Sequence, residues 1–268
     1  MPTLTWPTEA LRAALAPHAG EGVWVDVLPA VDSTNSELMR RARAGDTQPT
    51  LLVAEAQTAG RGRLGRAWQS GPVGSALAFS LGLPLAPQDW SGLSLAVGLA
   101  LADALHDGVR IKWPNDLWWQ GRKLAGILIE TTAAPGLPDG ARHAVIGVGL
   151  NVDAPDGTGL STAPAWTREF APALDAPALL LRLAAPLLAA VRAFEAQGFA
   201  PLQARFAARD ALAGRPVRLS DGTEGQALGV SAQGALRVQT TAGVRDITSA
   251  EVSVRPLTPP APAPETTP

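Results

Sequence analysis

The residues from Ala59 to Trp68, AGRGRLGRAW, place three arginines among three glycines in a chain whose formal net charge is only −2. Glycines let backbone N–H groups point inward and let a ligand approach closely, and arginines bind phosphate or carboxylate through paired, charge-assisted hydrogen bonds. Trp68 adds a flat apolar surface for a ring. These residue types predict an anion-binding loop, which we expect to be disordered when empty and to close over its ligand.

The three glycines also match the G-x-G-x-x-G pattern of dinucleotide-binding loops. That pattern requires a helix to begin at the third glycine, Gly65, whereas the following RAWQSGPVGS contains two further glycines and a proline. A Walker A loop is absent from the sequence, because no Gly-Lys-Ser or Gly-Lys-Thr occurs. A surface loop with solvated arginines is the alternative that the residues alone leave open.

Lysine and asparagine are rare in this chain. Of the 22 lysines and arginines only Lys112 and Lys123 are lysines, and the three asparagines are Asn35, Asn115 and Asn151. A compact ammonium with a tunable pKa is not interchangeable with a guanidinium. The two lysines are therefore candidates for a site in which an ammonium is required.

The chain around these residues alternates between predicted strands and helices. Alternation and β-branched residues predict strands over residues 22–31, 50–57, 75–83, 109–119, 122–130 and 143–152. Helices are predicted over residues 91–106 and 178–197, with a kink or restart at Pro186. A third helix is predicted to begin with a capping box formed by Thr34 and Glu37 and to stop at Gly45. Residues 153–176 predict a long irregular connection.

The pattern changes at Arg215 to five short strand candidates separated by DG, QG and AG turns, which is typical of a small all-β barrel. The proline-rich segment after Pro256 cannot bury enough apolar surface to become ordered. The expected domains are an N-terminal extension over residues 1–20, an α/β domain over 21–212, a barrel over 213–256 and a disordered tail over 257–268.

Composition excludes several classes of protein and site. The chain has no cysteine, which rules out disulfides, thiolate metal sites and a cysteine nucleophile. The small net charge argues against general adhesion to nucleic acid or to anionic membrane. The N-terminal residues lack a signal-peptide pattern, and the apolar stretch from Leu93 to Leu105 is shorter than the roughly 20 residues of a membrane span. A cytoplasmic protein without a membrane partner is expected.

Five motifs resemble those of the biotin protein ligase family and follow the family's order: DSTN at 32–35, GRGRLGRAW at 60–68, KWPND at 112–116, RKLAGILIE at 122–130 and GVGLNV at 147–152. All three asparagines and both lysines fall within them. The resemblance implies an α+β fold, with a mixed sheet and flanking helices of the class II synthetase type, followed by a small SH3-like β barrel.

The resemblance also implies an activity and its partners. Enzymes of the family form biotinyl-5′-AMP from biotin and ATP and transfer biotin to a lysine of a carrier protein. The expected cofactors are therefore ATP and Mg²⁺, with biotin as the substrate. The expected partner is the biotin carboxyl carrier protein domain of a biotin-dependent carboxylase, and the chain is expected to be a monomer or homodimer.

Roles for individual residues follow from the same resemblance. Lys123 is implied to bridge the biotin carboxylate and the α-phosphate, Arg63 to cover the intermediate, and Asp116 to be a Mg²⁺ ligand or the base for the carrier lysine. The implied biotin-binding residues are Ser33, Thr34, Asn35, Gln57, Gly60, Arg61, Gly62, Arg63, Lys123, Gly126, Gly147 and Gly149. The implied ATP-binding residues are Arg63, Arg66, Trp68, Lys112, Asn115, Asp116 and Asn151.

Several of these residues also have a purely structural explanation. Ser33 and Thr34 are suitable helix caps, and Asp116 follows a proline and an asparagine as in an ordinary turn. Gly147 and Gly149 could serve close strand packing instead of leaving room for the biotin ring. Only the resemblance decides between these explanations at this point.

Two departures from the family pattern have consequences. Leu64 occupies a position where a further arginine is common, which could weaken the grip on the adenylate. Only 31 residues precede Asp32, too few for a helix-turn-helix domain, so no DNA-binding repressor role is expected.

The alternatives to a biotin protein ligase are a lipoate-type protein ligase or acyltransferase and, from another class, a nucleic-acid or peptide-binding module. Residues 213–256 contain no aromatic side chain for base stacking, which disfavours the module.

Overall fold

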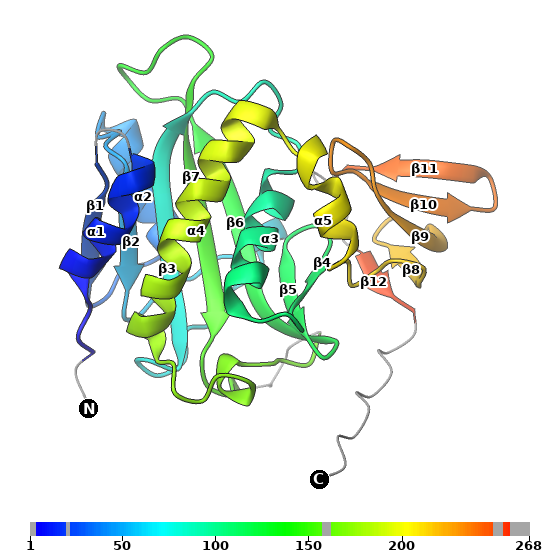
Figure 1. Ribbon diagram of the computed structural model, residues 1–268, viewed down its shortest axis with the longest axis horizontal. Helices are drawn as coiled ribbons and strands as arrows, with labels where there is room; N and C mark the ends of the chain where they lie inside the picture. The colour runs from blue at the N-terminus through cyan, green and yellow to red at the C-terminus, as the bar shows by residue number, and fades with distance from the viewer. Residues whose placement is uncertain (1–3, 20–21, 157–161, 249–253, 258–268) are drawn as a thin grey trace.

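The computed structural model describes residues 4–19, 22–156, 162–248 and 254–257, and its centre is a seven-stranded sheet (Figure 1). In chain order the strands are β1 Trp24–Leu28, β2 Thr50–Ala54, β3 Ala76–Leu85, β4 Arg110–Lys112, β5 Asp116–Trp119, β6 Arg122–Thr132 and β7 Arg142–Asn151. Their spatial order is β1-β2-β3-β7-β6-β5-β4. β1 and β2 are parallel and all other neighbours antiparallel, so the sheet is mixed as expected.

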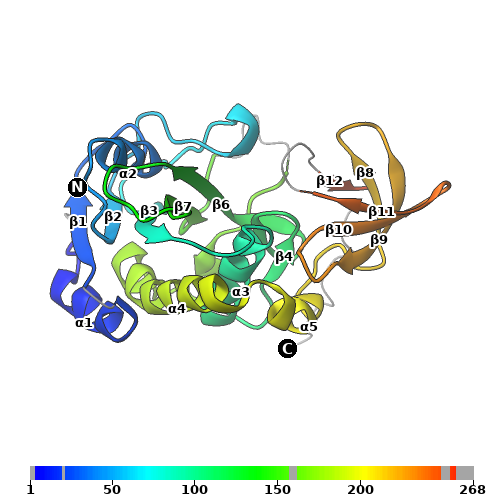
Figure 2. The same cartoon turned by 90° about the horizontal axis from the view of Figure 1, so that it is seen from above.

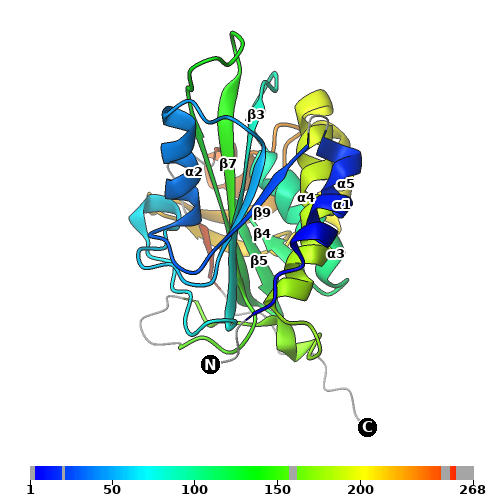
Figure 3. The same ribbon diagram turned by 90° about the vertical axis from the view of Figure 1, so that its left-hand side faces the viewer.

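Helices cover both faces of this sheet (Figure 3). α2 (Thr34–Arg43) lies on one face, whereas α1 (Thr8–Ala19), α3 (Leu93–Leu105) and α4 (Ala176–Gln197) lie on the other. Successive side chains along the strands point alternately into two buried hydrophobic clusters, a large one that includes Phe79 of β3 and a small one beneath α2. Ser80, the neighbour of Phe79, consequently faces α2.

α2 begins one residue earlier than the capping-box prediction implies. Ser33 is the N-cap, and its side chain accepts a hydrogen bond from the Ser36 N–H. Glu37 pairs with Arg40 and Arg41 instead of reaching back to the cap, so the prediction of a Thr34–Glu37 capping box was wrong. Thr34 is thereby released for other contacts.

α4 is a core helix. It runs unbroken from Ala176 to Gln197, so the expected restart at Pro186 does not occur. Proline removes one backbone hydrogen bond, but residues on both sides of it are buried, and the helix contacts α1, α3 and β3. By length and composition alone α4 could cross a membrane, but half of its most apolar window is buried.

α1 is an element that the sequence pattern did not predict. It lies in the segment expected to be an N-terminal extension, yet Leu11 and Leu15 are buried and the helix packs against α4 and β1. Two prolines, Pro7 before the helix and Pro17 inside it, masked the helical signal. α1 therefore contributes to the core of the α+β domain.

The C-terminal strands form a second sheet at the β4 end of the first (Figure 2). After the short helices η3 (Ala200–Leu202) and α5 (Gln203–Ala207), its strands are β8 Pro216–Leu219, β9 Glu224–Val230, β10 Leu236–Thr240, β11 Gly243–Ile247 and β12 Val254–Pro256. They are antiparallel, in the order β11-β10-β9-β8-β12. All five strand candidates are thus confirmed, and the expected tail beyond Leu257 lies outside the described residues.

A buried contact attaches this second sheet to the α+β domain. The Trp113 Nε1–H donates to the Gly234 carbonyl at 3.0 Å, and Gln203 Nε2 donates to the Val230 carbonyl at 2.7 Å. Gly234 also lies so close to Gly92 that an added Cβ would be 2.8 Å from the Gly92 Cα. Because Trp113 stands between Lys112 and Asn115, the contact holds the C-terminal sheet beside two predicted site residues.

Candidate active site

Buried polar side chains gather at the first turn of α2. Ser33, Thr34 and Asn35 are all buried, and the Thr34 N–H and hydroxyl donate to Gln57 Oε1 at 2.8 and 3.2 Å. The Ser80 hydroxyl is hydrogen-bonded to Thr34 Oγ1 at 2.7 Å and to Asn35 Oδ1 at 2.6 Å. Four predicted biotin-binding residues therefore lie together. Ser80 was not predicted to be a site residue. The sequence signal that could have identified it is a polar residue inside an apolar strand.

Two glycines of β7 face this group and leave room for protein side chains. A Cβ at Gly147 would lie 2.1 Å from Asn35 Oδ1, and a Cβ at Gly149 would lie 2.4 Å from the Trp68 ring. We expected these glycines to make room for the biotin ring directly. In the structure Asn35 lies against Gly147 and Trp68 against Gly149, so the glycines admit these two side chains, and room for the biotin ring stays a prediction.

The arginine–glycine loop folds back on itself. The Trp68 N–H donates to the Gly60 carbonyl at 2.8 Å, and the Gly62 N–H donates to the Arg66 carbonyl at 2.7 Å. Gly60 is required at its position, because a Cβ there would lie 2.5 Å from the Trp68 carbonyl oxygen. Leu64, with φ of 56°, is in the left-handed region at the loop tip and is exposed. Disorder of the loop without ligand stays a prediction.

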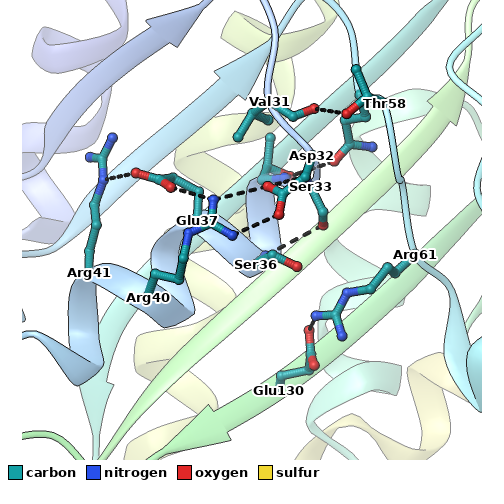
Figure 4. A network of polar contacts seen from close by, with 12 residues as sticks. Val31, Asp32, Ser33, Ser36, Glu37, Arg40, Arg41, Thr58, Arg61 and Glu130 are labelled. Carbon is teal, nitrogen blue, oxygen red and sulfur yellow. Dashed lines mark hydrogen bonds and ion pairs between the residues drawn. The ribbon is translucent and has the colours of Figure 1, made fainter.

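Two arginines of the loop reach the sheet. Arg61 Nη2 lies 2.5 Å from Glu130 Oε2 on β6 (Figure 4), and Arg63 Nη1 donates to Asn115 Oδ1 at 3.4 Å. Burial lowers the pKa of Arg63, with Asp116 opposing this effect. Glu130 was not predicted to be a site residue, although it is the last residue of the RKLAGILIE motif. These contacts hold the loop over the face of the sheet that carries α2.

The second lysine of the chain is paired with the predicted catalytic carboxylate. Lys123 Nζ lies 2.8 Å from Asp116 Oδ1, and the two side chains are 33% and 15% exposed. A Cβ at Gly126 would be 3.4 Å from Lys123 Nζ, so the glycine keeps the ion pair open on that side. Lys123 is thereby oriented by a carboxylate while a third of its side chain stays exposed.

Lys112 supplies a buried cation beside this pair. Its side chain is almost completely buried, and burial lowers its pKa to about 8. The charges of Lys123, Arg66 and Arg255 lower the pKa further, whereas Asp116 opposes them. Arg255 lies on β12, so the C-terminal sheet contributes to the positive potential here. A region with this excess of cations is suited to a polyanion.

Asn115 and Asn151 support the backbone around the lysines. Asn115 Nδ2 donates to the Ile127 carbonyl at 2.8 Å, and Asn151 Nδ2 donates to the Ala165 carbonyl at 2.9 Å and to the Lys123 carbonyl at 3.4 Å. Both were predicted near the nucleotide. In the structure their amide nitrogens donate hydrogen bonds to the strand that carries Lys123, and the Asn115 amide oxygen also accepts a hydrogen bond from Arg63.

The donor set for Mg²⁺ is small. Within the described ranges, no group of three or more His, Cys, Asp or Glu side chains is arranged to hold a metal ion. Mg²⁺ commonly binds one or two carboxylates together with substrate phosphates, and Asp116 fits that pattern as a single protein ligand.

The indole N–H of Trp68 has no hydrogen-bond partner among the residues that the structure describes. Its Nε1 atom is buried, which leaves a donor for a ligand.

Strand register sets these groups in a row. Gly149 of β7 is opposite Gly126 of β6, and Gly126 is opposite Asp116 of β5. Residues directly opposite each other share a face of the sheet, as do residues two apart on one strand. The row therefore runs from Gly147 beneath Asn35, past Trp68, to the Lys123–Asp116 pair. Such a row can hold a molecule that is polar but neutral at one end and anionic at the other.

Comparison with known proteins identifies the family. Residues 27–151 match the biotin/lipoate A/B protein ligase family, and residues 213–255 match the biotin protein ligase C-terminal domain. This chain belongs to the biotin protein ligase family. The resemblance inferred from the five motifs is thus confirmed, and the members of the family are enzymes.

Individual ligases show how far the similarity extends. The bifunctional ligase/repressor BirA of Escherichia coli K12 is 37% identical over 267 residues, which cover 94% of this chain and 81% of BirA. The biotin–[acetyl-CoA-carboxylase] ligase of Paracoccus denitrificans is 36% identical over 245 residues, 84% of this chain and 98% of that ligase. The Aquifex aeolicus biotin protein ligase, solved with biotin and ATP, has a TM-score of 0.73 at 28% identity and covers 87% of this chain and 99% of its own.

Proposed function

We propose that this ligase forms biotinyl-5′-AMP from biotin and ATP and then transfers biotin to a specific lysine of a biotin carboxyl carrier protein domain. The observation that supports this most directly is the row from the buried polar group of α2 to the Lys123–Asp116 pair. Ser33, Thr34, Asn35 and Gln57 supply hydrogen-bonding groups for a polar ring. The cations at the other end of the row suit a carboxylate and a triphosphate.

In the first step a biotin carboxylate oxygen attacks the α-phosphorus of ATP. A carboxyl–phosphate bond forms, the bond from the α-phosphorus to the β-phosphate oxygen breaks, and pyrophosphate leaves. Two anions approach each other and charge builds up at phosphorus, so preorganised cations lower the barrier. Lys123 lies between the two reacting groups in this proposal, and Asp116 holds it in place. Lys112 and Arg66 attract the remaining phosphates.

In the second step the amine of the carrier lysine attacks the acyl carbon of the adenylate. The bond from that carbon to the phosphate oxygen breaks, and AMP leaves with the electron pair. The amine loses a proton, for which Asp116 is the proposed acceptor. The mixed anhydride is already activated, so alignment of the lysine is the main remaining requirement. Arg63 retains the intermediate until the carrier arrives.

Mg²⁺ would enter with ATP, held by the phosphates and by Asp116, and would neutralise phosphate charge when bound. The proposed partner is the carrier domain of a biotin-dependent carboxylase, and the proposed location is the cytoplasm. We propose that the protein has no repressor role, and that it acts as a monomer or a homodimer.

Thermal melting with biotin or lipoate, each with and without MgATP, tests the proposal. A ligand at roughly 1,000 times its Kd adds about 4 kcal/mol to stability. We expect Tm to rise with biotin and to rise further with MgATP, accompanied by biotin-dependent release of pyrophosphate. A rise with lipoate alone would instead support the lipoate-type ligase, and no release of pyrophosphate with biotin would overturn the adenylate mechanism.

A further inference from the structure

Glu130 connects the arginine–glycine loop to the buried polar group of α2. Its Oε2 atom lies 2.5 Å from Arg61 Nη2 and accepts a hydrogen bond from Asn35 Nδ2 at 3.0 Å. Figure 4 shows Arg61 and Glu130 facing each other from the loop and from β6. The same oxygen therefore contacts both Arg61 of the loop and Asn35, which is proposed to bind the polar ring of biotin.

The position of Asn35 depends on this contact. Its Nδ2 also donates to the Leu128 carbonyl at 3.1 Å, and its Oδ1 is 2.6 Å from the hydroxyl of the buried Ser80. The absence of a Cβ at Gly147 lets the amide lie against β7, because an added Cβ there would be only 2.1 Å from Oδ1. Both the nitrogen and the oxygen of the Asn35 amide are thus hydrogen-bonded, and Glu130 is the charged residue among these partners.

We propose that Glu130 is a positioning residue that links closure of the loop to the order of the ring-binding residues. With the loop closed, Arg61 neutralises the carboxylate and the carboxylate orients Asn35. When the loop opens, Glu130 loses the contact that fixes its side chain from the loop side, so the carboxylate can turn away from Asn35. By reciprocity, a ligand that fixes Asn35 favours the closed loop. This inference rests on the proposed function only for the identity of the ligand.

The ion pair is partly exposed, at 45% for the Arg61 side chain and 25% for Glu130, so its effect on closure is modest. Exposed pairs of this kind change an equilibrium by up to about fivefold. Glu130→Gln is the informative variant. Its amide oxygen can still accept from Asn35, but it no longer pairs with the Arg61 charge. Glu130→Ala removes both contacts.

Limited digestion with trypsin in the absence of ligand measures loop opening, because the loop itself contains cleavage sites after Arg63 and Arg66. When opening is fast, the cleavage rate follows the open population. We expect cleavage at these two sites to be up to about fivefold faster in Glu130→Gln than in the wild type. Equal rates in the two proteins would overturn the proposal.

Glu195→Gln is the matched control. Glu195 on α4 pairs with Arg192 at 3.0 Å, accepts the Ala86 N–H at 2.9 Å and has a side chain 28% exposed, but α4 covers the face of the sheet opposite to α2. We expect it to leave loop cleavage unchanged. Acceleration equal to that of Glu130→Gln would show a general loss of stability and would overturn the specific link.

A double-mutant cycle separates the pair from a general structural effect. If the contact acts on closure, Arg61→Gln and Glu130→Gln accelerate cleavage after Arg63 and Arg66 by less together than the product of their separate effects. Strictly multiplicative effects would contradict the link. With MgATP and biotin, Glu130→Gln should also release biotinyl-AMP faster than the wild type. If the wild type forms no adenylate, the proposed function fails, whereas the cleavage results still decide the role of Glu130.

Discussion

Replacing Lys112 with methionine should raise the free energy of unfolding at neutral pH. The Lys112 ammonium is buried near Lys123, Arg66 and Arg255, and its pKa falls from 10.5 to about 8 mainly because of burial. Below pH 8 the folded protein therefore carries a charge that its surroundings disfavour, whereas the unfolded chain carries the same charge in water. Methionine keeps an unbranched apolar stem and removes the charge.

The size and sign of the effect follow from the pKa difference. A difference of about 2.5 corresponds to roughly 3 kcal/mol. Because the folded pKa is the lower one, the unfolded state binds more protons between about pH 8 and pH 10.5, and wild-type stability rises with pH in that window. The penalty is complete below pH 8. The advantage of Lys112→Met should therefore be largest at neutral pH and shrink toward pH 10.

Urea unfolding of both proteins at pH values of about 7, 8 and 9.5 measures this difference. Lys123→Met is the matched control, because the Lys123 side chain is 33% exposed and its ammonium has Asp116 at 2.8 Å, so removal of this charge should give no comparable gain. The reasoning is refuted if Lys112→Met is no more stable than the wild type at pH 7, or if its gain is the same at all three pH values.

Three further substitutions test the proposed roles. Lys123→Ala should abolish biotin-dependent pyrophosphate release while circular dichroism shows a native fold, and near-normal release would contradict the bridging role. Arg63→Gly should leak biotinyl-AMP and label bystander proteins, detected by streptavidin blotting, and unchanged selectivity would count against retention of the intermediate. Gly149→Ala would place a Cβ 2.4 Å from the Trp68 ring, so the ring must move. We expect its KM for ATP to rise several-fold more than its KM for biotin, and equal changes would argue against Trp68 beside the nucleotide.

Local sequence signals predicted most of the elements but not their exact limits. Buried apolar runs identified β3 and β7, and the turn pairs of the C-terminal region identified all five short strands. The start of α2 was misplaced because Ser33 and Thr34 are both good caps, and the choice depends on Gln57, which binds Thr34 from 23 residues away. α1 was missed because its stability comes from packing against α4 and not from its own pattern.

The motifs predicted which residues form the site, but not how they contact one another. Asn35, Lys123 and Asp116 were assigned from the motifs that contain them. The contacts of Ser80 and Glu130 with Asn35 could be recognised only from the folded sheet, since they join residues 45 and 95 positions apart in the sequence. Contacts between distant segments depend on strand order and register, which a single sequence does not reveal.

The two lysines of this arginine-rich chain differ from its arginines in having a compact charged group that can also give up its charge. At position 112 a guanidinium would stay charged at all accessible pH values beside Lys123, Arg66 and Arg255. An ammonium with a pKa of about 8 keeps most of its charge at neutral pH but loses its proton above pH 8, which relieves that repulsion. An arriving phosphate favours the protonated form, so it raises this pKa and keeps the charge over a wider pH range. A pKa this close to neutrality lets the ammonium at position 112 respond to a bound anion, which a guanidinium there could not do.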